Sequence, residues 1–367
     1  MKVPFLDLKA QYETLREEVQ TAINEVLESC AFCNGPAVKR FEQSFGEYVG
    51  AREVVCVNSG TSALHLSLIA AGVGPGDEVI VPAMTFVATA WAASYCGARP
   101  VFVDIDETSY TLDPARVEQA ITPRTKAVIP VHLYGLAADL AALRAVSEKH
   151  GVALIEDAAQ AHGARYDGRH VGTFGRTGCF SFYAGKNLGA YGEGGAIVTD
   201  DAALAARLRA LRDHGQRTKY HHDEIGFNYR MESLQGAVLE VKLRHLPAWT
   251  QARQRIAGRY LEALADTDLV LPAVPPDREH VWHLFVVLHP ERDRIKEALQ
   301  QAGIATGLHY PIPVPYLDAY STLGHQPGKF PVAEKIAAQC LSLPMYAEMS
   351  DAQQGHVIAQ VRKAAGP

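Results

Sequence analysis

The sequence predicts an α/β protein with a mostly parallel sheet in a large domain, followed by a smaller α+β C-terminal domain. Short apolar runs alternate with helical stretches between residues 54 and 212, as in sheets whose strands are joined by helices. The chain also has 367 residues, too many for one ordinary core. We therefore expect an N-terminal segment and large domain over residues 1–250 and a small domain over residues 251–367.

The expected elements follow in chain order. Amphipathic helices come first, at residues 11–30 and Ala37–Val49. The strands of the sheet are expected at Val54–Val57, Glu78–Val81, Pro100–Val103, Ala127–Val131, Ala153–Ile155, Gly178–Phe182 and Gly195–Val198. Further helices are expected at Ser62–Ala71, Ala138–His150, Ala202–Arg212 and Leu234–Leu264. The glycine-rich link before Gly195 is too short for a parallel crossover, so one of the last two strands should be antiparallel.

The composition shifts after the long helical stretch, at Leu271–Pro276. Beyond this point we expect a strand at Trp282–Leu288, a helix at Arg292–Ala302 and a proline-broken segment at Tyr310–Tyr316. This mixture predicts the smaller α+β domain.

Composition excludes several classes of protein. The net charge of −6 gives no basic field for nucleic acid, and no apolar run approaches the ~20 residues of a membrane span. Residues 1–8 lack the apolar core of a signal peptide, so we expect a cytoplasmic protein. Cys30 and Cys33 form a single C-x-x-C without the second pair or histidines of a zinc site. Ordinary cysteines near a helix end are the favoured interpretation.

The first chemical signal is the turn Asn58–Ala63, which follows a strand and begins a helix. Free N–H groups and the helix dipole make such a turn an anion site, and Gly60 permits close approach of a ligand. The hydroxyl groups of Thr61 and Ser62 add donors. Taken alone, the motif is more typical of a plain helix cap.

The second and third signals are a carboxylate and a lysine. Asp157 lies just past an apolar strand, at the sheet edge where ligands of α/β proteins bind. It could pair with a pyridinium nitrogen or simply cap a helix. Lys186 follows an apolar strand and precedes a glycine-rich loop; poor solvation there would lower its pKa and leave a nucleophilic amine, although most lysines are surface groups. Ser181 could supply a further phosphate donor.

Together these signals predict a phosphate cradle, a pyridinium partner and a Schiff-base lysine on one sheet edge. With them the chain resembles the DegT/DnrJ/StrS family of sugar aminotransferases, which have the fold-type I aminotransferase architecture. The resemblance covers essentially the whole chain. The matching segments are Pro4–Leu8, Asn58–Leu64, Gly74–Val79, Thr85–Ala88, Glu156–Gln160, Ser181–Lys186, Gly192–Gly195, Gly226–Arg230 and His309–Pro313.

The resemblance implies a role for each matching residue. It implies that pyridoxal 5'-phosphate forms a Schiff base with Lys186 and that Asp157 pairs with its ring nitrogen. Phe86 would stack on the ring, and Gln160 would approach its phenolic oxygen. The phosphate would be bound by Gly60, Thr61, Ser62 and Ser181, together with Asn228 from the partner subunit of a homodimer with shared active sites. The sugar or donor site would be bordered by Arg230, His309 and Tyr310, although Phe86 and His309 could also be core residues.

The implied activity is transamination of a nucleotide-linked keto sugar, with L-glutamate as donor, in amino-sugar biosynthesis. The loop Asn187–Tyr191 lacks the hydroxyl-rich stretch of relatives that aminate C-4, which favours a 3-keto sugar; a 4-keto sugar is the alternative. A sugar dehydratase of the same family would carry histidine in place of Lys186, and a non-enzymatic regulator would not need that lysine. Two positions depart from the family pattern: Ala184 replaces a frequent proline, and Cys33–Pro36 is a variant segment.

No metal is expected, because the implied chemistry needs none. His214 and the run His221–Glu224 are interpreted as a solvated loop near the dimer interface.

Overall fold

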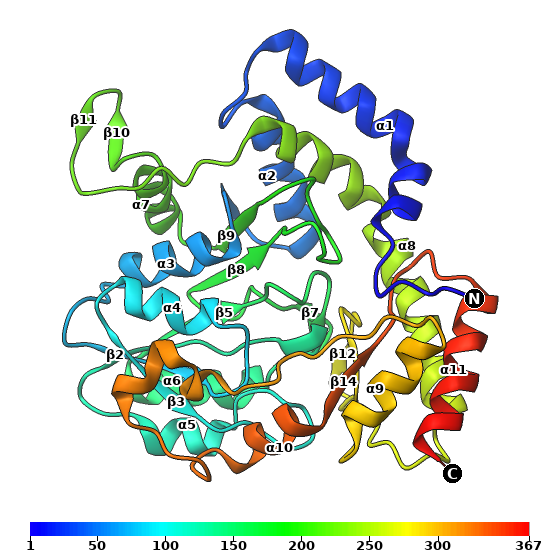
Figure 1. The fold of residues 1–367 in the computed structure, drawn as a ribbon. Coiled ribbons are helices and arrows are strands. Elements are labelled where there is room, and N and C mark those ends of the chain that lie inside the picture. The colour runs from blue at the N-terminus through cyan, green and yellow to red at the C-terminus, as the bar shows by residue number, and fades with distance from the viewer. Residues whose placement is uncertain (367) are drawn as a thin grey trace.

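The computed structural model describes residues 1–366, and its centre is a seven-stranded sheet with strand order β1-β9-β8-β5-β4-β2-β3 (Figure 1). The strands are β1 (Glu53–Val57), β2 (Glu78–Pro82), β3 (Arg99–Val103), β4 (Thr125–Val128), β5 (Ala153–Asp157), β8 (Thr177–Ser181) and β9 (Gly195–Thr199). β9 pairs antiparallel with β1 and β8, whereas the other neighbouring pairs are parallel. The predicted fold class and the predicted antiparallel strand are both confirmed.

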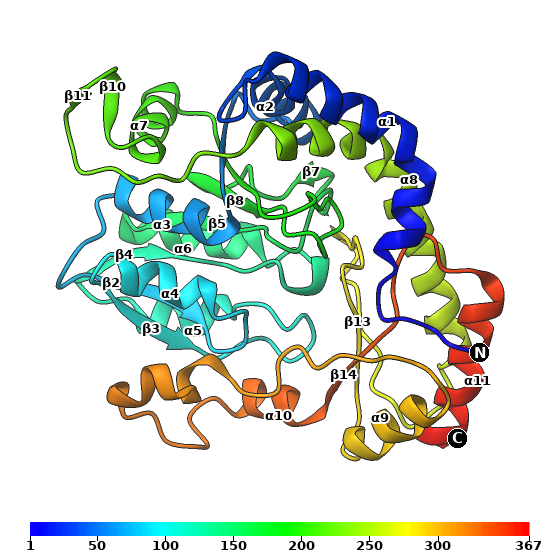
Figure 2. The same ribbon diagram turned by 45° about the horizontal axis from the view of Figure 1, so that its top comes forward.

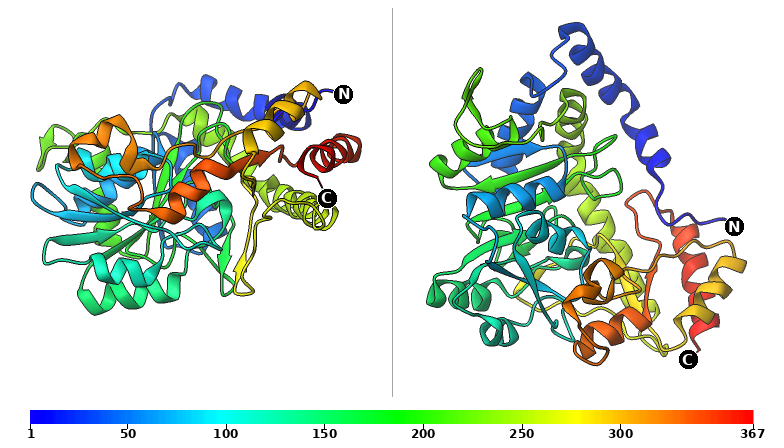
Figure 3. Two further views of the ribbon diagram at one scale, coloured as in Figure 1. Left: turned by 60° about the horizontal axis from the view of Figure 1, so that its bottom comes forward. Right: turned by 60° about the vertical axis from the view of Figure 1, so that its left-hand side comes forward.

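Helices cover both faces of this sheet (Figure 3). Apolar side chains point to both faces of the sheet, because successive residues of a strand alternate between faces. In β1, Val55 and Val57 belong to one core cluster, and Val54 and Cys56 belong to another. The first cluster includes residues of α3 (Gly60–Ala70), α4 (Ala88–Tyr95) and α7 (Ala202–Arg212). The opposite face is covered by α2 (Pro36–Val49), α5 (Pro114–Ala120), α6 (Leu140–His150) and α8 (Ser233–Ala263).

The N-terminal helix α1 (Leu8–Ser29) lies alongside α8 rather than on the sheet (Figure 2). Its buried Leu15 and Val19 pack against Val238 and Val241 of α8. Asp7 caps the helix, because its Oδ1 accepts a hydrogen bond from the N–H of Ala10 at 2.9 Å. Cys30 ends it in the left-handed region at φ 51°, and both Cys30 and Cys33 are exposed free thiols.

The C-terminal part has its own core on the second half of α8. Tyr260, Phe285 and Tyr346 are fully buried there, and Val3 of the N-terminal segment joins them. The elements are α9 (Arg292–Gln301), α11 (Asp351–Ala365) and the antiparallel pair β13 (Phe285–Leu288) and β14 (Cys340–Leu343). β13 is shorter than the expected strand, because Trp282 has a φ of 50° that no strand residue adopts.

The expected domain boundary at residue 250 falls inside α8. In addition, a segment that follows this boundary packs against the large sheet. The segment from η2 (Val314–Tyr316) through η3 (Asp318–Leu323) to α10 (Pro331–Gln339) returns to the large sheet. Its Tyr320, Phe330 and Ala333 pack in the same cluster as α3 and α4. The division into two domains stays a prediction.

The remaining elements are small. β12 (Arg278–Glu279), β6 (Arg165–Tyr166) and β7 (Arg169–His170) form a three-stranded sheet, and η1 (Leu133–Gly135) is a single turn. The hairpin of β10 (Gln216–Thr218) and β11 (His221–His222) projects from the body of the molecule (Figure 1). None of the helices within residues 1–366 combines the length and apolar character that a membrane span needs.

Candidate active site

The candidate site lies where the carboxyl ends of the parallel strands meet. The turn after β1, the loop after β2, the end of β5 and the turn after β8 all reach this edge of the sheet. A cavity of about 690 Å³ opens there. Its lining includes these residues predicted from sequence: Gly60, Thr61, Phe86, Asp157, Gln160, Ser181, Lys186, His309 and Tyr310. The topology thus brings together groups up to 250 residues apart in sequence.

The turn between β1 and α3 presents the positive end of a helix to this cavity. Ser59 caps α3, since its Oγ accepts a hydrogen bond from the N–H of Ser62 at 3.1 Å. The hydroxyl of Ser62 donates to Oδ1 of Asn58 at 2.7 Å, and Ser62 does not line the cavity. The cavity is therefore bordered by Gly60 and Thr61, whose N–H groups lie at the helix start and favour an anion.

Two glycines allow the strands and this turn to pack closely. A Cβ on Gly60 would lie 2.6 Å from Cβ of Ser181, and a Cβ on Gly195 would lie 2.4 Å from the carbonyl of Ser59. Any side chain at these positions would push the turn after β1 away from β8 and β9. Glycine at both positions keeps Thr61 and Ser181 on the same wall of the cavity.

Asp157 is the last residue of β5 and is 5% exposed. Its Oδ2 accepts a hydrogen bond from the hydroxyl of Thr89 at 2.8 Å, and its Oδ1 accepts one from the N–H of Ala159 at 3.1 Å. Burial raises the pKa of the Asp157 carboxyl, whereas these two hydrogen bonds and the Lys186 ammonium oppose the rise. The carboxylate is held rigidly and faces the cavity.

The neighbouring Glu156 has a different task. Its Oε1 accepts hydrogen bonds from the N–H groups of Phe174 and Gly175, and its Oε2 accepts one from Gly172. It is fully buried and does not line the cavity. Glu156 therefore stabilises the loop before β8, and adjacent carboxylates on one strand serve structure and site separately.

Lys186 follows β8 in a turn closed by its N–H, which donates to the carbonyl of Tyr183 at 2.8 Å. The side chain keeps some exposure because it faces the cavity, but protein surrounds it on the other sides. This desolvation lowers the pKa of the Lys186 amine to about 8, although the Asp157 carboxylate opposes the shift. A substantial neutral fraction near physiological pH makes the amine a nucleophile and a proton carrier.

Histidines around Lys186 stay neutral. Burial lowers the pKa of His309 to about 4 and that of His162 to about 3, and the Lys186 ammonium adds to both shifts. The pKa of His283 is also well below its usual range, again mainly through burial. His309 Nδ1 lies 2.8 Å from Oγ of Ser342, so its ring is oriented as well as uncharged. Consequently, Lys186 is the titrating amine at this end of the cavity.

Aromatic and amide groups complete the walls. Phe86 is 52% exposed and lies 5.9 Å, centroid to centroid, from the ring of Tyr310. Gln160 donates from Nε2 to the hydroxyl of Tyr310 at 3.1 Å and accepts at Oε1 from the N–H of Tyr134 at 2.8 Å. The exposed face of Phe86 is available for stacking, whereas Gln160 has its amide orientation fixed by two partners.

Besides Ser62, the predicted residues Asn228 and Arg230 do not line the cavity of their own chain. Asn228 is exposed, and its backbone forms an isolated antiparallel β-bridge with Asp213. Arg230 forms an ion pair with the side chain of Asp213 through Nη1. Both lie near the projecting hairpin of β10 and β11. Their predicted roles at the phosphate and the sugar stay predictions.

The cavity also includes residues for which the sequence predicted no role, above all Arg253, His283 and Glu193. Arg253 lies in the middle of the long helix α8, where an arginine is usually a surface group. His283 follows no recognisable strand end. Arg253 and His283 reach the cavity through the packing of segments that are distant in sequence. Glu193 had a sequence signal, because it lies within the matching segment Gly192–Gly195.

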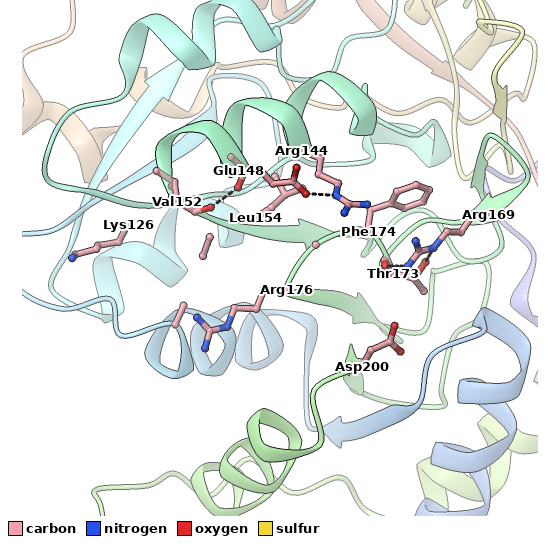
Figure 4. A pocket seen from close by; sticks show the side chains of 15 residues that line it. Lys126, Arg144, Glu148, Val152, Leu154, Arg169, Thr173, Phe174, Arg176 and Asp200 are labelled. Atoms are coloured by element: carbon pink, nitrogen blue, oxygen red, sulfur yellow. Dashed lines mark hydrogen bonds and ion pairs between the residues drawn. The ribbon is translucent and has the colours of Figure 1, made fainter.

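A second depression lies at the opposite, amino-terminal edge of the sheet (Figure 4). Its basic residues are Lys126, Arg144, Arg169 and Arg176. Arg144 is paired with Glu148 at 2.7 Å, and Arg169 donates to Oγ1 of Thr173 at 2.9 Å. None of the site residues predicted from sequence lines it. No cluster within residues 1–366 gathers enough histidine, cysteine or carboxylate groups to hold a metal ion.

Comparison with known proteins identifies the family of the chain. The model of the DegT/DnrJ/EryC1/StrS aminotransferase family matches residues 13–362. The chain belongs to this family. A relative from Saccharopolyspora erythraea, the erythromycin biosynthesis sensory transduction protein EryC1, is 50% identical over 100% of both chains. The dTDP-3-amino-3,4,6-trideoxy-alpha-D-glucose transaminase of Streptomyces venezuelae is 48% identical over 99% of this chain and 96% of its own.

A solved structure of this aminotransferase family has nearly the same fold. The crystal structure of S. venezuelae DesV in complex with a ketimine intermediate superposes with a TM-score of 0.98. It is 48% identical and covers 100% of this chain and 99% of its own. The fold expected from the resemblance is therefore confirmed.

Proposed function

We propose that the protein is a pyridoxal-phosphate-dependent transaminase that transfers an amino group from an amino acid, expected to be L-glutamate, to a nucleotide-linked 3-keto sugar. The observation that carries this proposal is the convergence of Lys186, Asp157 and the helix start at Thr61 on one cavity. Membership of an aminotransferase family and a relative named as a 3-amino-sugar transaminase support it.

The residues present fit pyridoxal phosphate. The start of α3 with Thr61 and Ser181 suits the phosphate, and the buried Asp157 suits a cationic ring nitrogen. Lys186 would hold the group covalently, and Phe86 offers an aromatic face. When bound, pyridoxal phosphate supplies an electron sink that stabilises negative charge on the donor's α-carbon.

The side chains then have separate tasks in the transfer. Lys186 Nζ would take a proton from one carbon and return it to another, because a pKa near neutrality suits both directions. The buried Asp157 carboxylate favours a positive charge facing it. The neutral His283 and His309 can orient a sugar hydroxyl without competing for that proton. The enclosing walls limit water at the reacting carbon.

The lowered pKa of Lys186 predicts how cofactor-free protein captures pyridoxal phosphate. The neutral amine reacts, so the second-order rate should rise with pH through 8 and level off near pH 9. For a pKa of about 8, the neutral fraction is about 9% at pH 7 and about 91% at pH 9. Stopped-flow growth of the visible absorbance band measures this rate. A rate that still climbs tenfold per pH unit beyond pH 9 would show an ordinary, solvated lysine.

We also propose that the active enzyme is a homodimer with shared sites. Asn228 is exposed near the projecting hairpin and is absent from the lining of its own cavity, as a residue that completes the partner's cavity would be. Exposed Tyr220 and Ile225 on the same projection are 79% and 91% accessible, which suits burial against another chain.

Asn228→Ala should therefore weaken retention of pyridoxal phosphate about tenfold, the loss of one hydrogen bond to a charged group. Equilibrium dialysis of the holoenzyme gives the dissociation constant, and sedimentation equilibrium gives the mass. Asn34→Ala, which changes an asparagine before α2 and outside the cavity, serves as control. A fully active monomer at assay concentration would contradict the shared site.

Two other functions of the same fold are less well supported. A dehydratase of the family would replace Lys186 with histidine, and this chain keeps the lysine. A regulator is suggested only by the names of two relatives, the sensory transduction protein of S. erythraea and the pleiotropic regulatory protein of Geobacillus stearothermophilus. Regulation would not require the desolvated amine of Lys186 facing the carboxylate of Asp157 across a cavity.

The choice of C-3 predicts a strong preference between matched substrates. The loop Asn187–Tyr191, which favoured C-3 in the sequence, does not line the cavity, and Leu188 is fully buried. It adjoins the cavity through Asn187, whose Oδ1 lies 3.3 Å from Nδ1 of the lining residue His283. A pocket that pairs the hydroxyls of one isomer leaves polar groups unpaired with another, so kcat/KM should favour the 3-keto sugar at least about 100-fold over the 4-keto sugar. NMR of the products identifies the aminated carbon. Exclusive amination at C-4 would refute the regiochemistry but not the transaminase.

A further inference from the structure

Arg253 is a buried cation in the wall of the catalytic cavity that has no assigned role. It lies on α8, is 5% exposed and lines the cavity beside His283 and Met345. One nitrogen, Nη1, donates to the carbonyl oxygens of Trp282 and Met345, each at 3.0 Å. This nitrogen therefore ties α8 to two loops of the C-terminal part.

The other two nitrogens of Arg253 are free to bind a ligand. Nε and Nη2 make no hydrogen bond within residues 1–366. Neither belongs to the buried atoms that lack a partner, so both keep contact with solvent. Because the residue is otherwise buried, the cavity is where these donors meet solvent. An arginine fork of this kind matches the paired oxygens of a carboxylate or a phosphate.

The charge of Arg253 is also incompletely compensated. Burial lowers its pKa to about 10, which leaves the guanidinium charged at neutral pH, and the Glu348 carboxylate acts on it only from a distance without a hydrogen bond. A buried cation without a paired anion is costly. Under the proposed function Lys186 holds the cofactor, and His283 and His309 are neutral. Among the described residues of this chain that line the cavity, Arg253 is then the cation available to a substrate anion.

We propose that Arg253 binds an anionic oxygen group of a substrate within the catalytic cavity. Two substrates of the proposed function, on which this inference rests, carry such groups: the amino-acid donor has carboxylates and the nucleotide-linked sugar has phosphates. Both present the oxygen pair that the guanidinium fork recognises, and they can be separated experimentally.

The test compares wild-type holoenzyme with Arg253→Gln and Arg253→Lys. One arm measures the glutamate concentration that gives half the maximal rate of bleaching of the visible band. The other arm measures the dissociation constants of uridine diphosphate and thymidine diphosphate by calorimetry. In Arg253→Gln we expect either the half-saturating glutamate concentration or the nucleotide dissociation constants to rise at least about tenfold, because a charged hydrogen-bond donor is removed. The cofactor content should be unchanged. Loss in the glutamate arm identifies the carboxylate, and loss in the nucleotide arm identifies the phosphates.

Arg292→Gln is the matched control. Arg292 also clamps backbone carbonyls, donating from Nη1 to Ala337 and Cys340, but it lies outside the cavity. Its loss should lower the melting temperature and leave both arms unchanged. If Arg253→Gln fails to fold, Arg253→Lys, which keeps the charge but loses the fork, should still weaken one arm several-fold.

Changes below twofold in both arms, in a folded and cofactor-loaded Arg253 variant, would overturn the proposal and make Arg253 a structural clamp. Failure of the proposed function looks different, because wild-type protein would then show neither bleaching by glutamate nor binding of the nucleotides.

Discussion

Lys186→Ala should abolish transamination, with a fall in kcat of at least about 10³-fold. A positioned acid–base group alone contributes roughly 10²–10⁴-fold, and the same residue is proposed to hold the cofactor. The other buried lysine, Lys242, cannot substitute, because its Nζ donates to the carbonyl of Gly189 at 2.7 Å and lies over the ring of Tyr191. The variant should also lack the visible band of the wild-type holoenzyme, which an absorbance spectrum shows directly.

Lys242→Met provides the control for Lys186→Ala. It removes an amine with a similarly lowered pKa of about 8 that does not line the cavity. The Met variant should keep the visible band even if it is less stable. A Lys186→Ala protein that turns over within tenfold of wild type, or a Lys242→Met protein that alone loses the band, would contradict the assignment of Lys186.

Asp157→Asn should lower kcat by about 10²–10³-fold with little effect on stability. The substitution keeps the size of the side chain and the hydrogen bond with Thr89, but removes the negative charge proposed to face the ring nitrogen. Loss of one partner of a buried charge pair costs roughly 3–5 kcal/mol, which corresponds to this range. Steady-state kinetics at saturating cofactor measures the effect.

Glu156→Gln is a matched control on the same strand. This carboxylate is also buried, but its partners are N–H groups of the loop before β8 and Nε2 of His132, at 3.0 Å, and it does not line the cavity. Glu156→Gln should lower the melting temperature and leave kcat within a few-fold of wild type. If Asp157→Asn retained more than a fifth of wild-type kcat, Asp157 would not be the partner of a ring cation.

The site could be predicted to the extent that its residues lie close to strand ends. Asp157 ends β5, Thr61 lies in the first turn of the helix that follows β1, and Lys186 lies in the turn that follows β8; the parallel strands bring these positions to one edge of the sheet. The antiparallel β9 was also predictable, because the link before it is short. Local sequence and one topological rule were sufficient for these residues.

The other residues depend on contacts between distant segments. Arg253 reaches the cavity because α8 packs against residues 282–283 and Met345, and no periodicity in the helix reveals it. The return of Tyr320 and Phe330 to the large core is likewise a tertiary effect. The motif predicted Ser62 as a phosphate ligand, and its hydroxyl donates to Oδ1 of Asn58 in this structure, so that role stays a prediction. Under the proposed homodimer, Asn228 would act in the cavity of the partner chain, which the fold of a single chain does not place.

The most direct test of the proposed transaminase is transfer of labelled nitrogen in a single reaction. Holoenzyme is incubated with ¹⁵N-labelled glutamate and a nucleotide-linked 3-keto sugar, and the product is examined by NMR. The proposed function predicts bleaching of the visible band by glutamate alone, its return when the sugar is added, and ¹⁵N bonded to C-3 of the sugar. Protein that holds pyridoxal phosphate but is not bleached by any amino acid, and leaves the sugar without ¹⁵N, would contradict it.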